Sequence, residues 1–152
     1  MTDHQLSGSP ARRPLPRRVA PLSLRINRVV WHTLRVPLAA DFRYDPGIPL
    51  TVSVTFRPPE GPRVTWRIGR DLLLDGLMEA TGDGDVRIWP LRGRSRWKVC
   101  LRLRSRGAQA LFEADLGALE TWLRGTYDVV PYGTELAGVD WDALVAELSE
   151  GG

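Results

Sequence analysis

The side chains that could perform covalent or metal chemistry are few in this chain of 152 residues. Cys100 is its single cysteine, and His4 and His32 are its two histidines. Cys100 and His32 have the composition of a thiol nucleophile with its base, but a cysteine in a strand is more often a small buried side chain. One cysteine and two histidines do not supply the usual ligand spacing of zinc. The sequence therefore favours neither a thiol centre nor a zinc site.

Acidic residues near the middle of the chain offer oxygen ligands of the kind that bind divalent cations. They are Asp71, Asp75, Glu79, Asp83 and Asp85. The twelve-residue calcium-loop pattern is absent, and alternating Gly and Asp is ordinary turn chemistry. No Gly-x-Ser-x-Gly motif marks a nucleophilic serine. We therefore predict a protein that is not an enzyme and that uses no metal or cofactor.

Basic residues are concentrated between residues 85 and 106, which hold eight Lys and Arg against one Asp. Alternate side chains of a strand share one face of its sheet. That spacing places five of them largely on one face: Arg94, Arg96, Lys98, Arg102 and Arg104. A basic sheet with an aromatic neighbour such as Trp89 can bind single-stranded nucleic acid. Residues 107–152 hold nine acidic residues against one Arg, so we favour a solvated face balanced by acidic neighbours.

The elements that must position these side chains follow from hydropathy and turn residues. Apolar patterns predict six strands, over residues 24–36, 50–57, 64–68, 85–92, 95–104 and 108–114. Helical spacing predicts a short helix over 69–79, a helix of roughly 12 residues after an Asp115 N-cap, and a last helix over 140–149. Prolines predict a loop over 37–49. Strands followed by helices are typical of the α+β class.

Two tryptophan environments are expected. Trp66, Trp97 and Trp122 match the apolar periodicities and are predicted to lie in the core. Trp89 precedes Pro90, which lacks the backbone donor of a sheet ladder, so the strand over 85–92 is predicted at an edge of the sheet. An edge strand can recruit a partner strand or a subunit.

The chain length suits one domain with one core. Residues 1–22 carry four prolines and the arginines of the 12–18 run, which predicts a disordered Arg/Pro-rich tail before a single domain over 23–152. No apolar run approaches the roughly 20 residues of a membrane span. Without a signal-peptide pattern, and with one cysteine, the expected location is the cytoplasm.

Several short segments carry a family resemblance through their order and spacing. The longest runs from Thr81 to Pro90 and joins a Gly–Asp turn to a strand ending in Trp-Pro. The others are Phe42-Arg43-Tyr44-Asp45-Pro46, Val64-Thr65-Trp66, Arg70-Asp71-Leu72-Leu73 with Gly76, and Val130-Pro131 with Gly133, Thr134 and Glu135. Together they resemble the SsgA-like family of actinomycete sporulation and cell division proteins, from about residue 40 to residue 149.

This resemblance implies a non-enzymatic cytoplasmic protein that acts at division septa through protein–protein contacts. Septum placement and recruitment of divisome proteins, such as FtsZ or another SsgA-like protein, are the implied roles. The implied fold is whirly-like, with two antiparallel sheets and helices assembled as a trimer. The tail over 1–22 and the arginines of 92–106 depart from compact family members. They leave single-stranded nucleic-acid binding as the alternative function.

The partner contact is predicted around the Gly–Asp turn, because Trp and Arg dominate the energetics of protein interfaces. The predicted contact residues are Arg70, Asp71, Asp83, Asp85, Arg87 and Trp89. The competing interpretation is that Asp83 and Asp85 only form the turn and that Trp89 packs internally. Both interpretations are compatible with the residues.

Overall fold

A computed structural model describes residues 18–82, 84–137 and 146 of the chain. Its strands form one seven-stranded sheet in the order β4-β3-β2-β1-β7-β6-β5. The strands are β1 (Leu22–Val30), β2 (Leu34–Arg43), β3 (Thr51–Arg57), β4 (Val64–Gly69), β5 (Val86–Arg92), β6 (Trp97–Ser105) and β7 (Ala108–Asp115). Every pairing is antiparallel. The predicted antiparallel architecture is present, as one continuous sheet and not as the two sheets that the resemblance implied.

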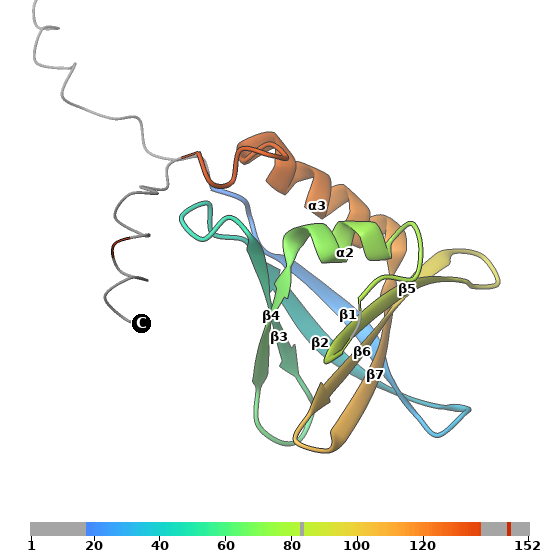
Figure 1. Cartoon of the computed structure of the whole chain (residues 1–152). Helices are drawn as coiled ribbons and strands as arrows, with labels where there is room; N and C mark the ends of the chain where they lie inside the picture. Colours follow the sequence, from blue (N-terminus) through green and yellow to red (C-terminus); the bar gives the residue numbers. More distant parts are fainter. Residues whose placement is uncertain (1–17, 83, 138–145, 147–152) are drawn as a thin grey trace, which may run out of the picture.

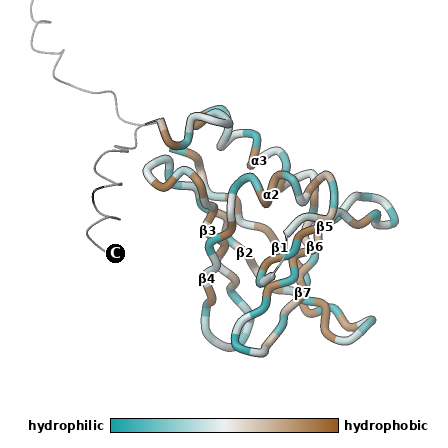
Figure 2. The backbone as a smooth tube through the Cα atoms, in the orientation of Figure 1, coloured by the Kyte–Doolittle hydropathy of each residue, from teal (hydrophilic) through white to brown (hydrophobic). Residues whose placement is uncertain are grey.

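The sheet curls into a half-barrel, and the two helices α2 (Arg70–Gly76) and α3 (Leu116–Val129) cover one end of it (Figure 1). Period-two alternation produces the inner face, since Val52, Val54 and Phe56 are buried while the residues between them are partly exposed. Figure 2 shows the same alternation of apolar and polar residues along the strands. Phe56 stacks on Phe112 at 4.3 Å between ring centroids, which joins β3 to β7 across the curve.

Helix α3 begins where the sequence predicted. The Asp115 carboxylate accepts a hydrogen bond from the backbone N–H of Ala118 at 2.9 Å, which confirms the N-cap. Leu119, Trp122 and Leu123 form its buried face. The helix thereby closes one end of the half-barrel.

The first predicted strand is in fact a hairpin, which corrects two expectations. Trp31 has a φ of 55° and starts a turn that ends β1, so the predicted strand over 24–36 is divided between β1 and β2. The predicted loop over 37–49 was also wrong, because β2 continues to Arg43. Pro37 is tolerated because it pairs with Asn27 of β1 and lies beyond Ala39, where the pairing with β3 begins. At Pro37 the strand is therefore a local edge.

The tryptophan predictions are only partly confirmed. Trp122 is buried and Trp66 packs against the core, but the side chain of Trp97 is 51% exposed at the start of β6. Trp97 is the first residue of β6 and directly follows the exposed β5–β6 turn. Trp31 is 83% exposed at the β1–β2 turn. The apolar pattern of a strand end therefore did not distinguish core from projecting side chains.

The first described residues belong to the packed domain. Val19 and Leu22 pack against the core, and the Ala20 carbonyl accepts a hydrogen bond from the Trp122 indole at 2.7 Å. These residues fall within the predicted tail of 1–22; residues 1–17 lie outside the described residues. The predicted helix over 140–149 lies outside them too, apart from Ala146. In the described part, neither helix has the length and apolar character of a membrane span.

Candidate partner surface on strand β5

Strand β5 lies at one edge of the sheet, as the Trp-Pro sequence predicted. Its edge is nevertheless closed to a continuous partner strand. Ile88 exchanges backbone hydrogen bonds with Thr81 on its free side, at 2.9 Å from its N–H and 2.8 Å to its carbonyl. Pro90, two residues on, has no N–H to offer. A partner on this edge must therefore be bound by side chains.

The Gly–Asp turn leads the chain from α2 into β5. Gly82 has a φ of +99°, and a Cβ there would lie 2.3 Å from the Val86 carbonyl oxygen, so only glycine fits. Asp85 is exposed, and its backbone carbonyl accepts a hydrogen bond from the Arg104 N–H at 2.9 Å. Asp83 lies outside the described residues. The backbone of Asp85 thus holds the turn against β6, while its side chain is exposed to solvent.

Arg87 and Trp89 lie on the outer face of β5, on either side of the fully buried Ile88. Arg87 is exposed and Trp89 is half-buried. The strand register sets Arg87 directly opposite Arg102 of β6. Arg87, Trp89 and Arg102 line a shallow depression together with Ala80 and Pro90. Like charges directly opposite on a sheet repel, so the pair favours an anionic group above it.

Arg102 is the residue that the sequence interpretation placed elsewhere, on the nucleic-acid face. Its Nε is buried and has no hydrogen-bond partner among the described residues. The register of the β5–β6 hairpin could have revealed that Arg102 lies opposite Arg87. A tight turn around Gly93 centres the hairpin so that Arg92 faces Trp97 and Arg87 faces Arg102. Periodicity within one strand does not contain that information.

Arg70 and Asp71, predicted as partner contacts, both make contacts within the protein, with Arg70 fully buried and Asp71 half-buried. The Arg70 guanidinium is fully buried and donates to the Thr126 carbonyl at 3.1 Å and to the Glu135 carboxylate at 2.9 Å. Its Cζ lies 3.8 Å from the centroid of the Tyr127 ring. The Tyr127 hydroxyl donates to Asp71 at 2.6 Å. Arg70 therefore ties the 131–135 segment to α2 and α3 and is not available at the surface.

The basic residues predicted for one face are divided among three environments. Arg94, Arg96 and Lys98 lie with Arg25 of β1 around a polar hollow at the β5–β6 turn. Arg102 lies beside Arg87, and Arg104 donates to Gln109 at 3.0 Å. Acidic neighbours also enter the hollow, because Glu113 and Asp115 line it. Lys98 Nζ lies 3.9 Å from the Glu113 carboxylate, in keeping with the balanced face that the sequence favoured.

The carboxylate of Glu113 on β7 lies close to two basic side chains, Arg35 and Lys98. Arg35 donates to this carboxylate at 2.8 and 3.1 Å. These hydrogen bonds hold the pKa of Glu113 below its ordinary value despite burial. The neighbouring Cys100 is 2% exposed, and burial raises the pKa of its thiol to about 11. His32 lies in the exposed β1–β2 turn, so no strand pairing brings it to Cys100.

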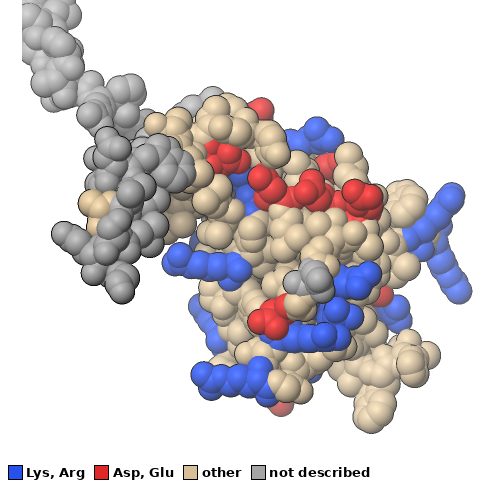
Figure 3. Space-filling model, viewed as in Figure 1, with Lys and Arg blue, Asp and Glu red and all other residues tan. Residues whose placement is uncertain are grey.

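Charge is distributed unevenly over the molecule. Figure 3 shows acidic side chains over the helical end and basic side chains around the sheet below it. Asp71 and Asp75 of α2 and Glu120 of α3 belong to the acidic end. Among the described residues, no three His, Cys, Asp or Glu side chains come together as metal ligands would. The architecture is that of a half-barrel protein with two helices over one end and a charged, tryptophan-containing edge.

Comparison with known proteins assigns the family. Residues 38–135 match the family model described as Streptomyces sporulation and cell division protein, SsgA. The sporulation-specific cell division protein SsgB of Frankia casuarinae is 41% identical over 133 residues, which are 88% of this chain and 92% of that protein. SsgB of Streptomyces coelicolor is 41% identical over 125 residues, which are 82% and 91% of the two chains.

Two solved structures of sporulation-specific cell division proteins have a fold similar to that of this chain. A structure from work on SsgB mutations that correlate with longitudinal cell division during sporulation of Streptomyces coelicolor superposes with a TM-score of 0.72 at 41% identity, over 76% of this chain and 91% of that one. An SsgA-like sporulation-specific cell division protein from Thermobifida fusca gives a TM-score of 0.74 at 34% identity, over 84% and 93%. The chain belongs to the SsgA family of sporulation and cell division proteins. The resemblance inferred from short segments is confirmed.

Proposed function

We propose that this protein is a non-enzymatic adaptor of sporulation-specific cell division, which helps to place the septum or to recruit the divisome. The observation that carries the proposal is the pair of the exposed Arg87 and the half-buried Trp89 on β5, next to Arg102 of β6. The relatives of this protein are sporulation-specific cell division proteins. Arginine and tryptophan are the residues that contribute most to binding at protein interfaces. We further propose that the adaptor works at division septa as a homo-oligomer, with a trimer as the expected state.

The partner surface consists of Asp85, Arg87, Trp89 and Arg102. Arg87 and Arg102 lie directly opposite each other on adjacent strands and line the same depression, so their guanidinium groups can bind one carboxylate-bearing segment between them. The half-buried Trp89 adds apolar area beside them. The proposed partner is FtsZ or another SsgA-like protein, bound through an acidic segment.

The test is binding of purified FtsZ to the full chain and to the double variant Arg87→Ala, Trp89→Ala. A matched control exists on the same hairpin, because Arg92 and Trp97 are cross-strand partners at its other end and both are exposed. We expect the first double variant to lose binding, by tenfold or more, while Arg92→Ala, Trp97→Ala binds like the original chain. Equal binding by both folded double variants would reject this surface.

A second candidate function rests on the polar hollow at the β5–β6 turn, where Arg25, Arg94, Arg96 and Lys98 lie together. Such a group suits the phosphates of single-stranded nucleic acid, as on a whirly-like sheet. Binding of that kind weakens steeply with salt through counterion release. Arg94→Ala, Arg96→Ala should then reduce the affinity for a single-stranded oligonucleotide and flatten its salt dependence. Absence of binding at about 50 mM salt would remove this function.

A further inference from the structure

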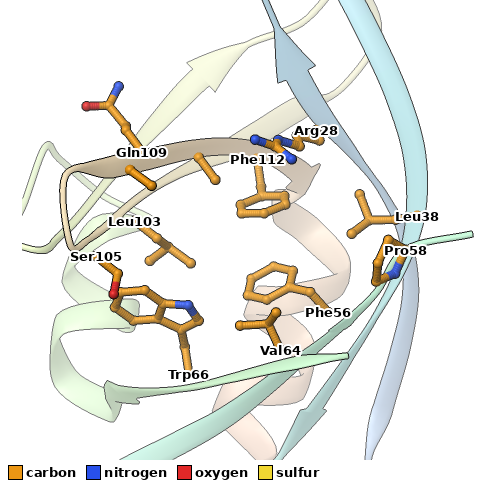
Figure 4. A pocket seen from close by; sticks show the side chains of 12 residues that line it. Arg28, Leu38, Phe56, Pro58, Val64, Trp66, Leu103, Ser105, Gln109 and Phe112 are labelled. Atoms are coloured by element: carbon orange, nitrogen blue, oxygen red, sulfur yellow. The ribbon is translucent and has the colours of Figure 1, made fainter. Parts of the chain in front are cut away.

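An apolar pocket opens at the end of the half-barrel opposite the helices, between the β3–β4 and β6–β7 hairpins (Figure 4). Its volume is about 260 Å³. The stacked rings of Phe56 and Phe112 line it together with Trp66 and Leu103. A cavity of about 150 Å³ with such a lining binds benzene, so this pocket has room for one large aromatic side chain. Sequence periodicity did not reveal it, because the curvature of the sheet creates it.

The surroundings of the pocket are basic. Arg28 lines it, and Gln109 lines it while accepting a hydrogen bond from Arg104. Arg63 and Arg106 lie in the two exposed turns that flank the opening, against a single acidic residue, Glu60. An apolar side chain with carboxylates beside it therefore matches the pocket in both shape and charge.

One exposed tryptophan of the chain does not meet this requirement. Trp31 projects from the β1–β2 turn and is 83% exposed. The hairpin around it carries Arg25, Arg28 and Arg35 and no acidic residue over 25–36. Like charges would oppose its entry into the basic opening of another copy. Charge thus disfavours this hairpin as the occupant.

The C-terminal sequence does meet the requirement. Residues 138–152 contain Asp140-Trp141-Asp142, four acidic residues in total and no Lys or Arg. Leu144, Val145 and Leu148 follow Trp141 at helical spacing, which is the pattern of a helix that binds in an apolar groove. We propose that the pocket binds Trp141 of a second copy of this chain, with Asp140 and Asp142 placed against the basic residues of the opening.

A second hollow beside the pocket can bind the residues that follow Trp141. It adjoins the pocket at Arg28, Leu38 and Pro58 and is lined further by Val30 and Val36. Val36 is 38% exposed. The apolar side chains that follow Trp141 can therefore continue along the same surface toward the β1–β2 hairpin.

Chain length favours an occupant that comes from another copy. Ala137 donates to the Thr134 carbonyl at 3.0 Å, and Glu135 is bound by Arg70, so the continuous described segment that ends at Ala137 lies beside α2. The pocket lies at the other end of β3, whose seven residues span about 23 Å. The four residues from Ala137 to Trp141 reach at most about 14 Å. Chain length therefore favours the pocket of another copy over the pocket of the same chain.

The resulting contact is heterologous, because the acidic C-terminal segment of one copy binds the basic open end of the next. Such contacts close into rings or extend into filaments. The inference deepens the proposed homo-oligomer and rests on it, but it is independent of the FtsZ surface on β5. Binding of FtsZ and self-association can therefore fail separately.

The first test is sedimentation velocity of the full chain over a concentration series. The original chain should self-associate, Trp141→Ala should weaken association by tenfold or more, and Trp97→Ala, an exposed tryptophan outside the pocket, should change nothing. Arg28→Glu and Asp142→Arg should each weaken association, and a mixture of the two should restore it in part. Unchanged association of Trp141→Ala, or release by Trp31→Ala in its place, would overturn the proposal.

The second test separates the pocket from the fold. A labelled peptide of residues 138–152 is titrated by fluorescence anisotropy into the full-length Trp141→Ala chain, whose pocket is free. We expect saturable binding that is lost for a peptide with Trp141→Ala and reduced tenfold in an Arg28→Glu background. A monomeric original chain together with absence of peptide binding would refute the assembly and the occupant; an oligomer without peptide binding would refute the occupant alone.

Discussion

Gly76→Ala is the substitution whose cost the structure determines most closely. Gly76 is the last residue of α2 and is buried against β5. A Cβ there would lie 2.3 Å from Cγ2 and 2.5 Å from Cβ of Ile88, where real contacts essentially never fall below 3.0 Å. Ile88 is fully buried, and its backbone exchanges both of its hydrogen bonds with Thr81 while it lies beside Leu101 of β6. The added methyl group must therefore displace β5 or α2.

The change in unfolding free energy caused by Gly76→Ala follows from two opposing effects. Overpacking a filled core costs about 1–3 kcal/mol, whereas replacing a helical glycine by alanine gains at most about 1 kcal/mol. We expect Gly76→Ala to lower the free energy of unfolding by about 1–2 kcal/mol, which is about 4–8 °C in Tm for a folded body of this size. Gly125 in α3 is the matched control, since a Cβ there meets nothing within 4 Å. Gly125→Ala should raise the stability.

The assay is urea unfolding of both variants, followed by tryptophan fluorescence with the slope of the transition held constant. Ile88→Leu removes the Cγ2 that lies closest, so adding it should recover part of the loss caused by Gly76→Ala, as a coupling energy in a double-mutant cycle. Arg87 and Trp89 flank Ile88, so Gly76→Ala should also weaken partner binding. If Gly76→Ala were as stable as the original chain, the packing argument would be refuted.

Three further outcomes are expected. The Arg35 contact lowers the pKa of Glu113 in the folded state, so the contact stabilises the fold fully above about pH 4.5 and less as the pH falls through the lower folded pKa. Glu113→Gln should therefore reduce the loss of unfolding free energy between about pH 5 and pH 3, measured by urea unfolding. An unchanged dependence of the unfolding free energy on pH would contradict this. The Cys100 thiol, with a pKa of about 11 and 2% exposure, should react with a thiol reagent at neutral pH only after unfolding; rapid native labelling would disprove its burial. Trp122→Phe removes the hydrogen bond to Ala20 and should cost about 1 kcal/mol, with faster proteolysis near Ala20; protection equal to that of the original chain would count against it.

Local sequence rules predicted the middle of the fold well. The alternation of β3 and β4, the strands β5 to β7 and the Asp115 cap follow from contacts between near neighbours in the chain. The β1–β2 hairpin was missed because Trp31 turns the chain without a glycine, proline or asparagine to signal it. The two halves of the sheet are joined by the long-range pairing of β1 with β7. No periodicity within one segment contains that pairing.

The candidate site was predicted in part for the same reason. Arg87 and Trp89 were proposed as contacts because the turn and the Trp-Pro sequence lie in one short segment, and the structure places them on the edge strand β5. Arg70 was misjudged as a surface residue, since its position at the start of a helix gave no sign that Tyr44, Tyr127 and Glu135 enclose it. These contacts join residues far apart in the chain. Their burial is a property of the folded core and not of the local pattern.

The most direct test of the adaptor account is live imaging of a fluorescent fusion in a sporulating actinomycete, with labelled FtsZ and a DNA stain. The account predicts that the original chain forms foci or ladders coincident with FtsZ at septa. Arg87→Ala, Trp89→Ala should lose this coincidence, and Arg92→Ala, Trp97→Ala should keep it. Signal spread over the nucleoids, or septal ladders formed equally by the Arg87→Ala, Trp89→Ala fusion, would contradict the account.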